Sequence, residues 1–136
     1  MKGIAKVNWV HMCDHAFFDN AGKVCLIGLF GSILTASAPA THPRCCFVVN
    51  MGGVPGENVA LVLQVAGPAE ERSLEDLRID NMTLGPAGDA TSIFLVNNLR
   101  LPGFGLYRIT VLVNGSPGQA GSFTVGRLPQ KNELVQ

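Results

Sequence analysis

Three residues near the N-terminus have the types and the spacing of a chemical site. His11, Cys13 and His15 alternate within the run VHMCDHAFF, so on a β-strand their side chains would point the same way. Imidazole and thiolate are zinc ligands, and His42 or a nearby cysteine could supply the fourth ligand that a structural zinc site needs. A thiolate between two bases could instead be a nucleophile. The third interpretation is the less apolar face of an ordinary strand.

The spacing favours the ordinary strand. Zinc ligands usually come in pairs held by tight turns, as in C-x2-C, and the sequence has no such pair. Same-face neighbours on a strand lie about 6–7 Å apart, which is too far for a base to reach the sulfur of Cys13 directly. The motifs G-x-S-x-G and H-E-x-x-H and the P-loop are also missing. We therefore expect no metal, no cofactor and no enzymatic activity.

Asp14 lies among apolar residues on the other face of the same segment. The alternate positions from Val10 to Phe18 would face the core, and Asp14 is the charged residue among them. An ionised carboxylate is costly to bury unless it is paired or hydrogen-bonded. We expect Asp14 to be a structural residue, paired with Lys23 across a hairpin, with His42 or Arg44, or with backbone N–H groups of a turn.

Composition and charge limit the class of protein. The chain has 136 residues, 47% of them hydrophobic and 15% charged, with a net charge of zero. This length predicts one domain, residues 1–126, followed by a polar tail, residues 127–136. Nucleic-acid binding needs a cationic field that this chain lacks. No apolar run approaches the roughly 20 residues of a membrane span, and the first residues do not look like a signal peptide. We therefore expect a cytoplasmic protein.

Short apolar runs separated by glycine and proline predict the fold. Turn-forming residues recur about every 8–12 positions, which is typical of an all-β, antiparallel, immunoglobulin-like β-sandwich with about 7–8 strands. Residues 36–43 are predicted as a loop or crossover. Residues 69–80 are open to two interpretations, a short helical turn capped by Ser73 or an approach to an edge strand that begins at Asp76.

Tyr107 precedes a strand in the sequence Gly105-Leu106-Tyr107, and its place resembles the tyrosine corner of immunoglobulin-like sandwiches. In that corner a buried hydroxyl bonds back to a nearby backbone group. The alternative is a tyrosine at the end of the sheet with its hydroxyl in water.

The order of several short motifs resembles a family of small bacterial proteins described as a domain of unknown function. The motifs are Cys13-Asp14-x-Ala16, Gly22-Lys23, Leu26-Ile27-Gly28-x-Phe30, His42-Pro43 and Gly105-x-Tyr107. His11 and His15 are not part of that pattern. The resemblance implies a small β-sandwich and assigns no activity.

With no catalytic constellation and no cationic patch, the sequence favours a protein-interaction or structural module that associates with itself. Trp9 and Phe17 are the expected interface residues, and the partner is a protein, with a homo-oligomer as the expected form. The alternative is a small-ligand or metal-binding protein that uses the face of His11, Cys13 and His15.

Overall fold

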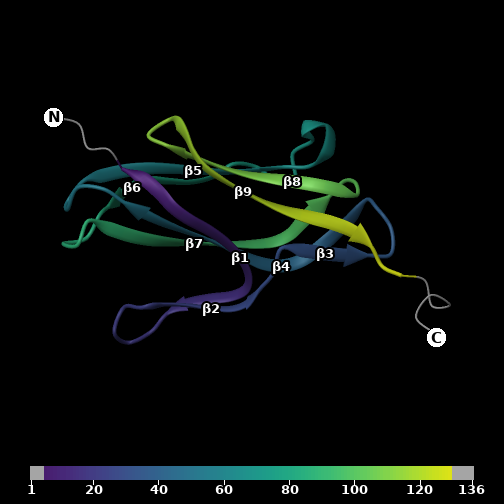
Figure 1. The fold of residues 1–136 in the computed structure, drawn as a ribbon, viewed down its shortest axis with the longest axis horizontal. Coiled ribbons are helices and arrows are strands. Elements are labelled where there is room, and N and C mark those ends of the chain that lie inside the picture. The colour runs from purple at the N-terminus through teal and green to yellow at the C-terminus, as the bar shows by residue number, and fades with distance from the viewer. Residues whose placement is uncertain (1–4, 130–136) are drawn as a thin grey trace.

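Two β-sheets pack face to face in the structure, which is a computed structural model (Figure 1). It describes residues 5–129, apart from the side chains of residues 119 and 120. The nine strands of the described residues are β1 (Lys6–Phe18), β2 (Val24–Leu29), β3 (Ser32–Thr35), β4 (Ala40–Gly52), β5 (Asn58–Ala66), β6 (Leu77–Thr83), β7 (Asp89–Leu101), β8 (Gly105–Val113) and β9 (Ser116–Arg127). A 3-10 turn, η1 (Pro68–Glu70), follows β5.

The predicted all-β sandwich is confirmed, with more strands than the 7–8 expected. One sheet has the order β2-β1-β4-β7 and the other has the order β3-β9-β8-β5-β6. Strand pairs are antiparallel except that the short β3 pairs with β9 in parallel. The apolar runs did not clearly define β3, which has four residues, or β6.

The core lies between the two sheets and follows the alternation of their strands. Alternate residues of β5, from Val59 to Val65, and of β8, from Tyr107 to Val113, are buried. Two aromatic rings add to this core, since Phe123 stacks on Tyr107 with ring centroids 5.0 Å apart. Such alternation is what the period of a strand with one face in the core requires.

Residues 36–43 are only in part the loop that the sequence predicts. Ala40 begins β4, so Pro43 lies inside a strand. Proline cannot donate a ladder hydrogen bond and is tolerated where one edge of the strand is unpaired. The pairing of β4 with β1 ends at Cys46, which leaves that edge of β4 without β1 around Pro43.

The charged stretch after β5 leads into an edge strand and does not form the capped helical turn. The 3-10 turn η1 ends at Glu70, and β6 then pairs with β5 at the edge of the five-stranded sheet. At the other end of the chain, Arg127 is the last residue of β9 and belongs to the predicted tail. Residues 130–136 of that tail lie outside the described residues.

Tyr107 forms the predicted corner. Its side chain is buried, and its hydroxyl donates a hydrogen bond to the carbonyl of Gly103 at 2.6 Å and accepts one from the Gly103 N–H at 3.1 Å. Gly67 leaves room for the ring, because a Cβ atom there would lie 2.7 Å from Cε2 of Tyr107. The corner therefore ties the β7–β8 connection to the core.

Candidate interaction surface

The first strand pairs with two partners in succession. Its first part pairs with β4 as far as Cys13, which lies opposite Cys46. From Cys13 to Phe18 it pairs with β2 instead. In Figure 1, β1 curves strongly along its length, and the β1–β2 hairpin projects below β4 and β7 of the same sheet.

The turn of this hairpin is built by local hydrogen bonds. Oδ1 of Asp19 accepts hydrogen bonds from the backbone N–H groups of Ala21 and Lys23, each at 2.9 Å. Gly22 has a φ of 82°, a conformation that glycine adopts without steric cost. These are the turn residues that the sequence indicated between the two strands.

A second, small apolar cluster holds the hairpin against the outer face of the four-stranded sheet. Its buried residues are Cys13, Cys46 and Val48. The partly buried side chains that pack on them come from the hairpin and from neighbouring strands: Trp9, Ala16, Val24, Leu26 and Ile93. One face of the hairpin is therefore covered, and Trp9, an expected interface residue, belongs to this cluster.

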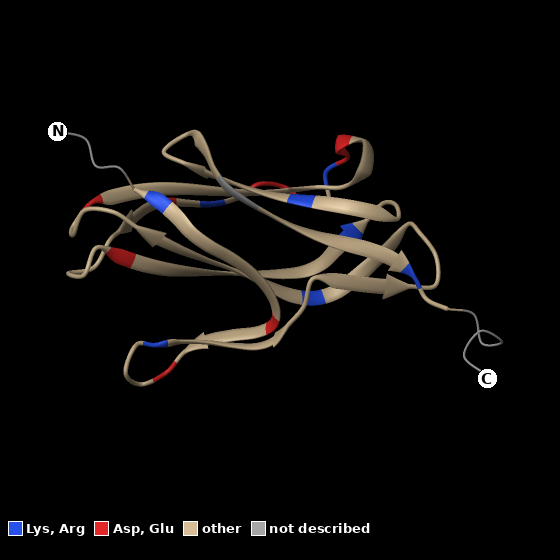
Figure 2. Cartoon of the chain, in the orientation of Figure 1, with Lys and Arg blue, Asp and Glu red and all other residues tan. Residues whose placement is uncertain are grey.

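The opposite face of the hairpin exposes large apolar side chains. His15 lies opposite Ile27 and Phe17 opposite Cys25, so these four residues share a face, and the exposed Leu29 follows Ile27 by two residues on β2. Phe17 is 47% exposed, Ile27 53% and Leu29 59%. We call these five residues the hairpin face. In Figure 2 the hairpin carries charge only at its tip and near the bend of β1.

The outer edge of β2 is unpaired within the described residues, because β2 ends the order of its sheet. Its sequence, VCLIGL, contains no charged residue and no proline. Natural edge strands are usually protected from pairing with other chains by such residues, by bulges or by a covering segment. The edge of β2 and the adjoining hairpin face together form the strongest candidate surface for contact with another chain.

Asp14 does not lie on the core face, so the expected burial of its carboxylate is wrong. β1 bends where Met12 packs into the main core and Cys13 into the second cluster, and Asp14 is exposed. In the described part of the chain its carboxylate has no hydrogen bond or ion pair with Lys23, His42, Arg44 or any other residue. It lies instead against Gly28, whose φ is 74° and whose missing side chain leaves the space that Asp14 occupies.

Most of the chain matches the model of one protein family. The model of a family of unknown function, DUF6941, matches residues 8–126. The chain belongs to this family. No curated protein matches the sequence.

Solved structures with a similar fold share little sequence with this DUF6941 chain. An alkylpurine DNA glycosylase, AlkC of Pseudomonas fluorescens, bound to DNA containing an abasic site analog, matches with a TM-score of 0.51 and 12% identity, over 86% of this chain and 30% of that one. An immunoglobulin-like protein from Pseudomonas aeruginosa matches with a TM-score of 0.46 and 12% identity, over 90% of this chain and 96% of that one.

A β-glucosidase from Listeria innocua, in complex with glucose, matches with a TM-score of 0.48 and 8% identity, over 92% of this chain and 16% of that one. The DUF6941 chain thus spans less than a third of the glycosylase and of the glucosidase. Identities this low show the fold alone. Within the described residues, no helix is long and apolar enough to cross a membrane.

Four residues of the short motifs noted in the sequence lie around one pocket. Asp14, Gly28, Phe30 and His42 line a hollow of about 310 Å³ between the hairpin, β3 and β4. The imidazole of His42 packs on the Phe30 ring, with centroids 5.6 Å apart. These motif residues therefore lie together at the base of the hairpin.

The histidines do not gather around Cys13 as ligands. His11 is exposed and packs on Trp9 with ring centroids 4.9 Å apart, while His42 lies with Phe30. His15 is exposed on the hairpin face, and only its carbonyl accepts a hydrogen bond from the Cys13 thiol, at 3.3 Å. Residues 5–129 contain no group of three or more His, Cys, Asp or Glu side chains placed to hold a metal ion.

Burial disfavours the thiolate form of Cys13 and of Cys45. Burial raises the pKa of Cys13, and the neighbouring Cys46 and Asp14 raise it further. Burial also raises the pKa of Cys45 to about 12. A nucleophilic cysteine needs the opposite change, a lowered pKa.

We expect one thiol of the four to react with Ellman's reagent in the folded protein at about pH 8, and all four in denaturant. Cys25 is half-buried and is the expected reactive residue, whereas the other three are buried. The Cys25→Ser variant should show no rapid reaction in its folded state. Rapid reaction of a second thiol in that variant would contradict the burial of the other three.

The sequence analysis did not predict that Ile27 and Leu29 would lie on an exposed face beside Phe17. Phe17 was expected at an interface, and it is exposed on this face. Counting outward from the turn at Asp19 would place Ile27 opposite His15, and therefore beside Phe17. The register of the hairpin was thus the available signal.

Proposed function

We propose that the protein is a non-enzymatic interaction module that associates with a second copy of itself through the hairpin face and the free edge of β2. The observation that carries this proposal is the position of the exposed apolar side chains. Phe17, Phe18, Ile27 and Leu29 are four of the ten large apolar side chains that are exposed in the described residues. They lie on one hairpin, beside an unprotected strand edge.

A second copy suits this surface because the surface can pair with itself. Two β2 edges can pair antiparallel about a two-fold axis, so that each copy presents the same patch to the other. The hairpin face contains no lysine, arginine or carboxylate, and the net charge of the chain is zero, so little charge repulsion opposes the contact. The proposal includes a cytoplasmic location, where the four free thiols would stay reduced.

Sedimentation velocity over a range of protein concentrations tests the proposal. We expect the wild-type protein to form dimers as its concentration rises, and Ile27→Lys to weaken the dimer by at least about tenfold. A two-fold contact would bring the two introduced lysines close together, so their charges would repel. Leu106→Lys is the matched control, because Leu106 is 55% exposed and lies on β8, in the other sheet.

Two results would contradict the proposal. One is a wild-type protein that stays monomeric at about 100 µM, a concentration at which even a weak specific dimer with a micromolar Kd forms. The other is equal weakening of the dimer by Ile27→Lys and Leu106→Lys, which would show that the hairpin face does not form the dimer contact. Circular dichroism of both variants checks that they keep the fold.

A further inference from the structure

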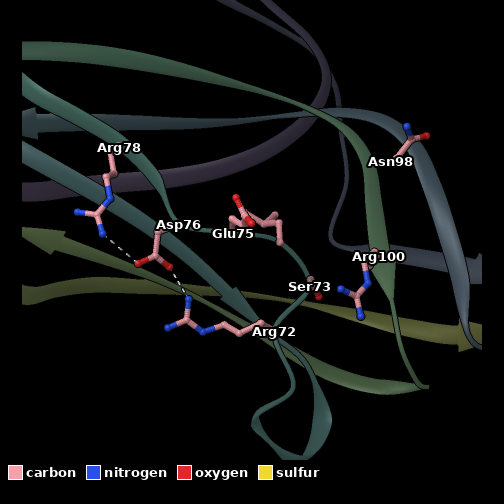
Figure 3. A pocket seen from close by; sticks show the side chains of 8 residues that line it. Arg72, Ser73, Glu75, Asp76, Arg78, Asn98 and Arg100 are labelled. Carbon is pink, nitrogen blue, oxygen red and sulfur yellow. Dashed lines mark hydrogen bonds and ion pairs between the residues drawn. The ribbon is translucent and has the colours of Figure 1, made fainter.

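A second surface feature lies at the opposite edge of the sandwich from β2. A pocket of about 650 Å³ opens between the segment that leads into β6 and the end of β7 (Figure 3). Three arginines, Arg72, Arg78 and Arg100, line it together with two carboxylates. The pocket therefore has a net positive charge in a chain whose overall charge is zero.

Two of these arginines hold one of the carboxylates. Arg72 forms a salt bridge with Asp76, and Nη2 of Arg78 lies 3.7 Å from Oδ2 of the same side chain. Nε2 of Gln64 donates a further hydrogen bond to that oxygen at 3.2 Å. The hydrogen bond from Arg72 lowers the pKa of Asp76 most, so Asp76 stays ionised and its oxygens are occupied. Figure 3 shows the two guanidinium groups on either side of Asp76.

The third arginine is free. Arg100 forms no salt bridge within the described residues, and in Figure 3 its guanidinium points toward Ser73. The two residues are joined through their backbones, because the Arg100 N–H donates to the Ser73 carbonyl at 3.3 Å. Asn98, two residues before Arg100, has a φ of 59°, a conformation that is uncommon outside glycine. The strand is thus irregular at the place where Arg100 enters the pocket.

Ser73 supplies an independent indication of a ligand. Ser73 is 1% exposed, and its buried Oγ has no hydrogen-bond partner among the described residues. Buried hydroxyl groups are normally hydrogen-bonded, so an unpartnered one beside a free guanidinium indicates a partner outside the chain. An acceptor that both the hydroxyl and the guanidinium can reach would satisfy them together.

We propose that this pocket binds a phosphate group, with the guanidinium of Arg100 and the hydroxyl of Ser73 as donors. The planar fork of arginine matches phosphate oxygens, and a phosphate has enough acceptor oxygens for both donors. Arg72 and Arg78 add to the favourable field although Asp76 engages them. The volume of the pocket exceeds that of the phosphate group, so the same site can accept either inorganic phosphate or a small phosphate monoester.

Calorimetric titration in a phosphate-free buffer of low ionic strength tests this proposal. Inorganic phosphate and adenosine 5′-monophosphate are the two probes. We expect Arg100→Gln to weaken the binding by about tenfold, because a charge-assisted hydrogen bond is lost. Arg108→Gln is the matched control, since Arg108 pairs with Glu70 at 3.0 Å and does not line the pocket.

The Ser73→Ala variant distinguishes a role of Ser73 in phosphate binding from a role in stability. We expect it to weaken phosphate binding by several-fold and yet to leave the thermal midpoint equal or higher, because the substitution removes an unpartnered buried hydroxyl. A lower thermal midpoint with unchanged phosphate affinity would show a structural role only and would overturn the assignment of Ser73 as a donor.

The two probes identify the source of the phosphate. Tighter binding of the nucleotide than of inorganic phosphate supports a phosphate monoester as ligand, and equal binding supports the phosphate group alone. Absence of binding of both probes at millimolar concentration overturns the proposal, as does equal weakening by Arg100→Gln and Arg108→Gln. None of these outcomes depends on whether the hairpin face forms a dimer.

Discussion

Replacing Tyr107 by alanine is expected to lower the free energy of unfolding by about 4 kcal/mol, and replacing it by phenylalanine by about 1.5 kcal/mol. Alanine removes a buried ring that stacks on Phe123 with centroids 5.0 Å apart and leaves a cavity between the sheets. Phenylalanine keeps the ring and removes only the hydroxyl, which leaves the carbonyl and N–H of Gly103 without their partner.

Urea unfolding followed by circular dichroism measures both losses. Leu106→Ala is the control at the next position, where the exposed side chain should contribute no more than about 0.5 kcal/mol. If Tyr107→Phe were as stable as the wild-type protein, the two hydrogen bonds of the corner would contribute nothing. If the phenylalanine and alanine variants were equally unstable, the buried ring itself would contribute nothing to stability, which would contradict the prediction.

The parts of the fold that follow from alternation could be predicted from the sequence. On β8, the residues from Tyr107 to Val113 on one face are apolar, and the core contains that face. The turn at Asp19 and Gly22 also follows from residue type, because these side chains favour the hydrogen bonds and the positive φ that the turn needs. Period and turn chemistry are local properties, so one sequence is enough to show them.

The bend of β1 could not be predicted in this way. Strict alternation puts Asp14 on the core face with Met12, but β1 changes partners at Cys13, and the following residues turn away from the main core. A change of partner depends on where β4 and β2 lie, which is a tertiary property. The same cause places Pro43 inside β4, because the departure of β1 frees the edge that proline requires.

The two candidate surfaces differ in how far they could be predicted from the sequence. The hairpin face needs only the register of one turn, and Phe17 already pointed to it. The phosphate pocket combines Ser73 with Arg100, which come together because the segment before β6 packs against β7. Neither residue belongs to a motif, and an unpartnered hydroxyl can be recognised only once its surroundings are known.

Gly28→Ala is expected to destabilise the hairpin by about 2–3 kcal/mol, for two reasons that can be separated. A residue with a Cβ atom costs about 1–2 kcal/mol in the left-handed conformation, and Gly28 has a φ of 74°. The added methyl group would also collide with the carboxylate of Asp14 and would lie 3.1 Å from the Asp14 Cβ. The carboxylate would have to rotate out of its position, which has a cost, and the Cβ atom is fixed by the backbone of β1.

Gly22→Ala provides the matched control in the same hairpin. Gly22 has a φ of 82°, and a Cβ atom there would meet nothing within 4 Å, so only the conformational cost of about 1–2 kcal/mol applies. The difference between the two variants measures the contact with Asp14. In an Asp14→Ala background, Gly28→Ala should cost about 1 kcal/mol less than in the wild-type protein, because no carboxylate has to be displaced, although the contact with the Cβ atom of residue 14 remains. An unchanged cost would mean that the carboxylate of Asp14 does not oppose a side chain at this position.

The same pair of variants links the hairpin backbone to the proposed dimer. Gly28 lies between Ile27 and Leu29, so a shift of its backbone moves two side chains of the hairpin face and the free edge of β2. Gly22 lies in the turn, outside that face. We therefore expect Gly28→Ala to weaken self-association by at least about tenfold in sedimentation velocity, and Gly22→Ala to leave it unchanged at temperatures where both variants are folded. Equal effects of the two substitutions would mean that any dimer forms through another part of the molecule.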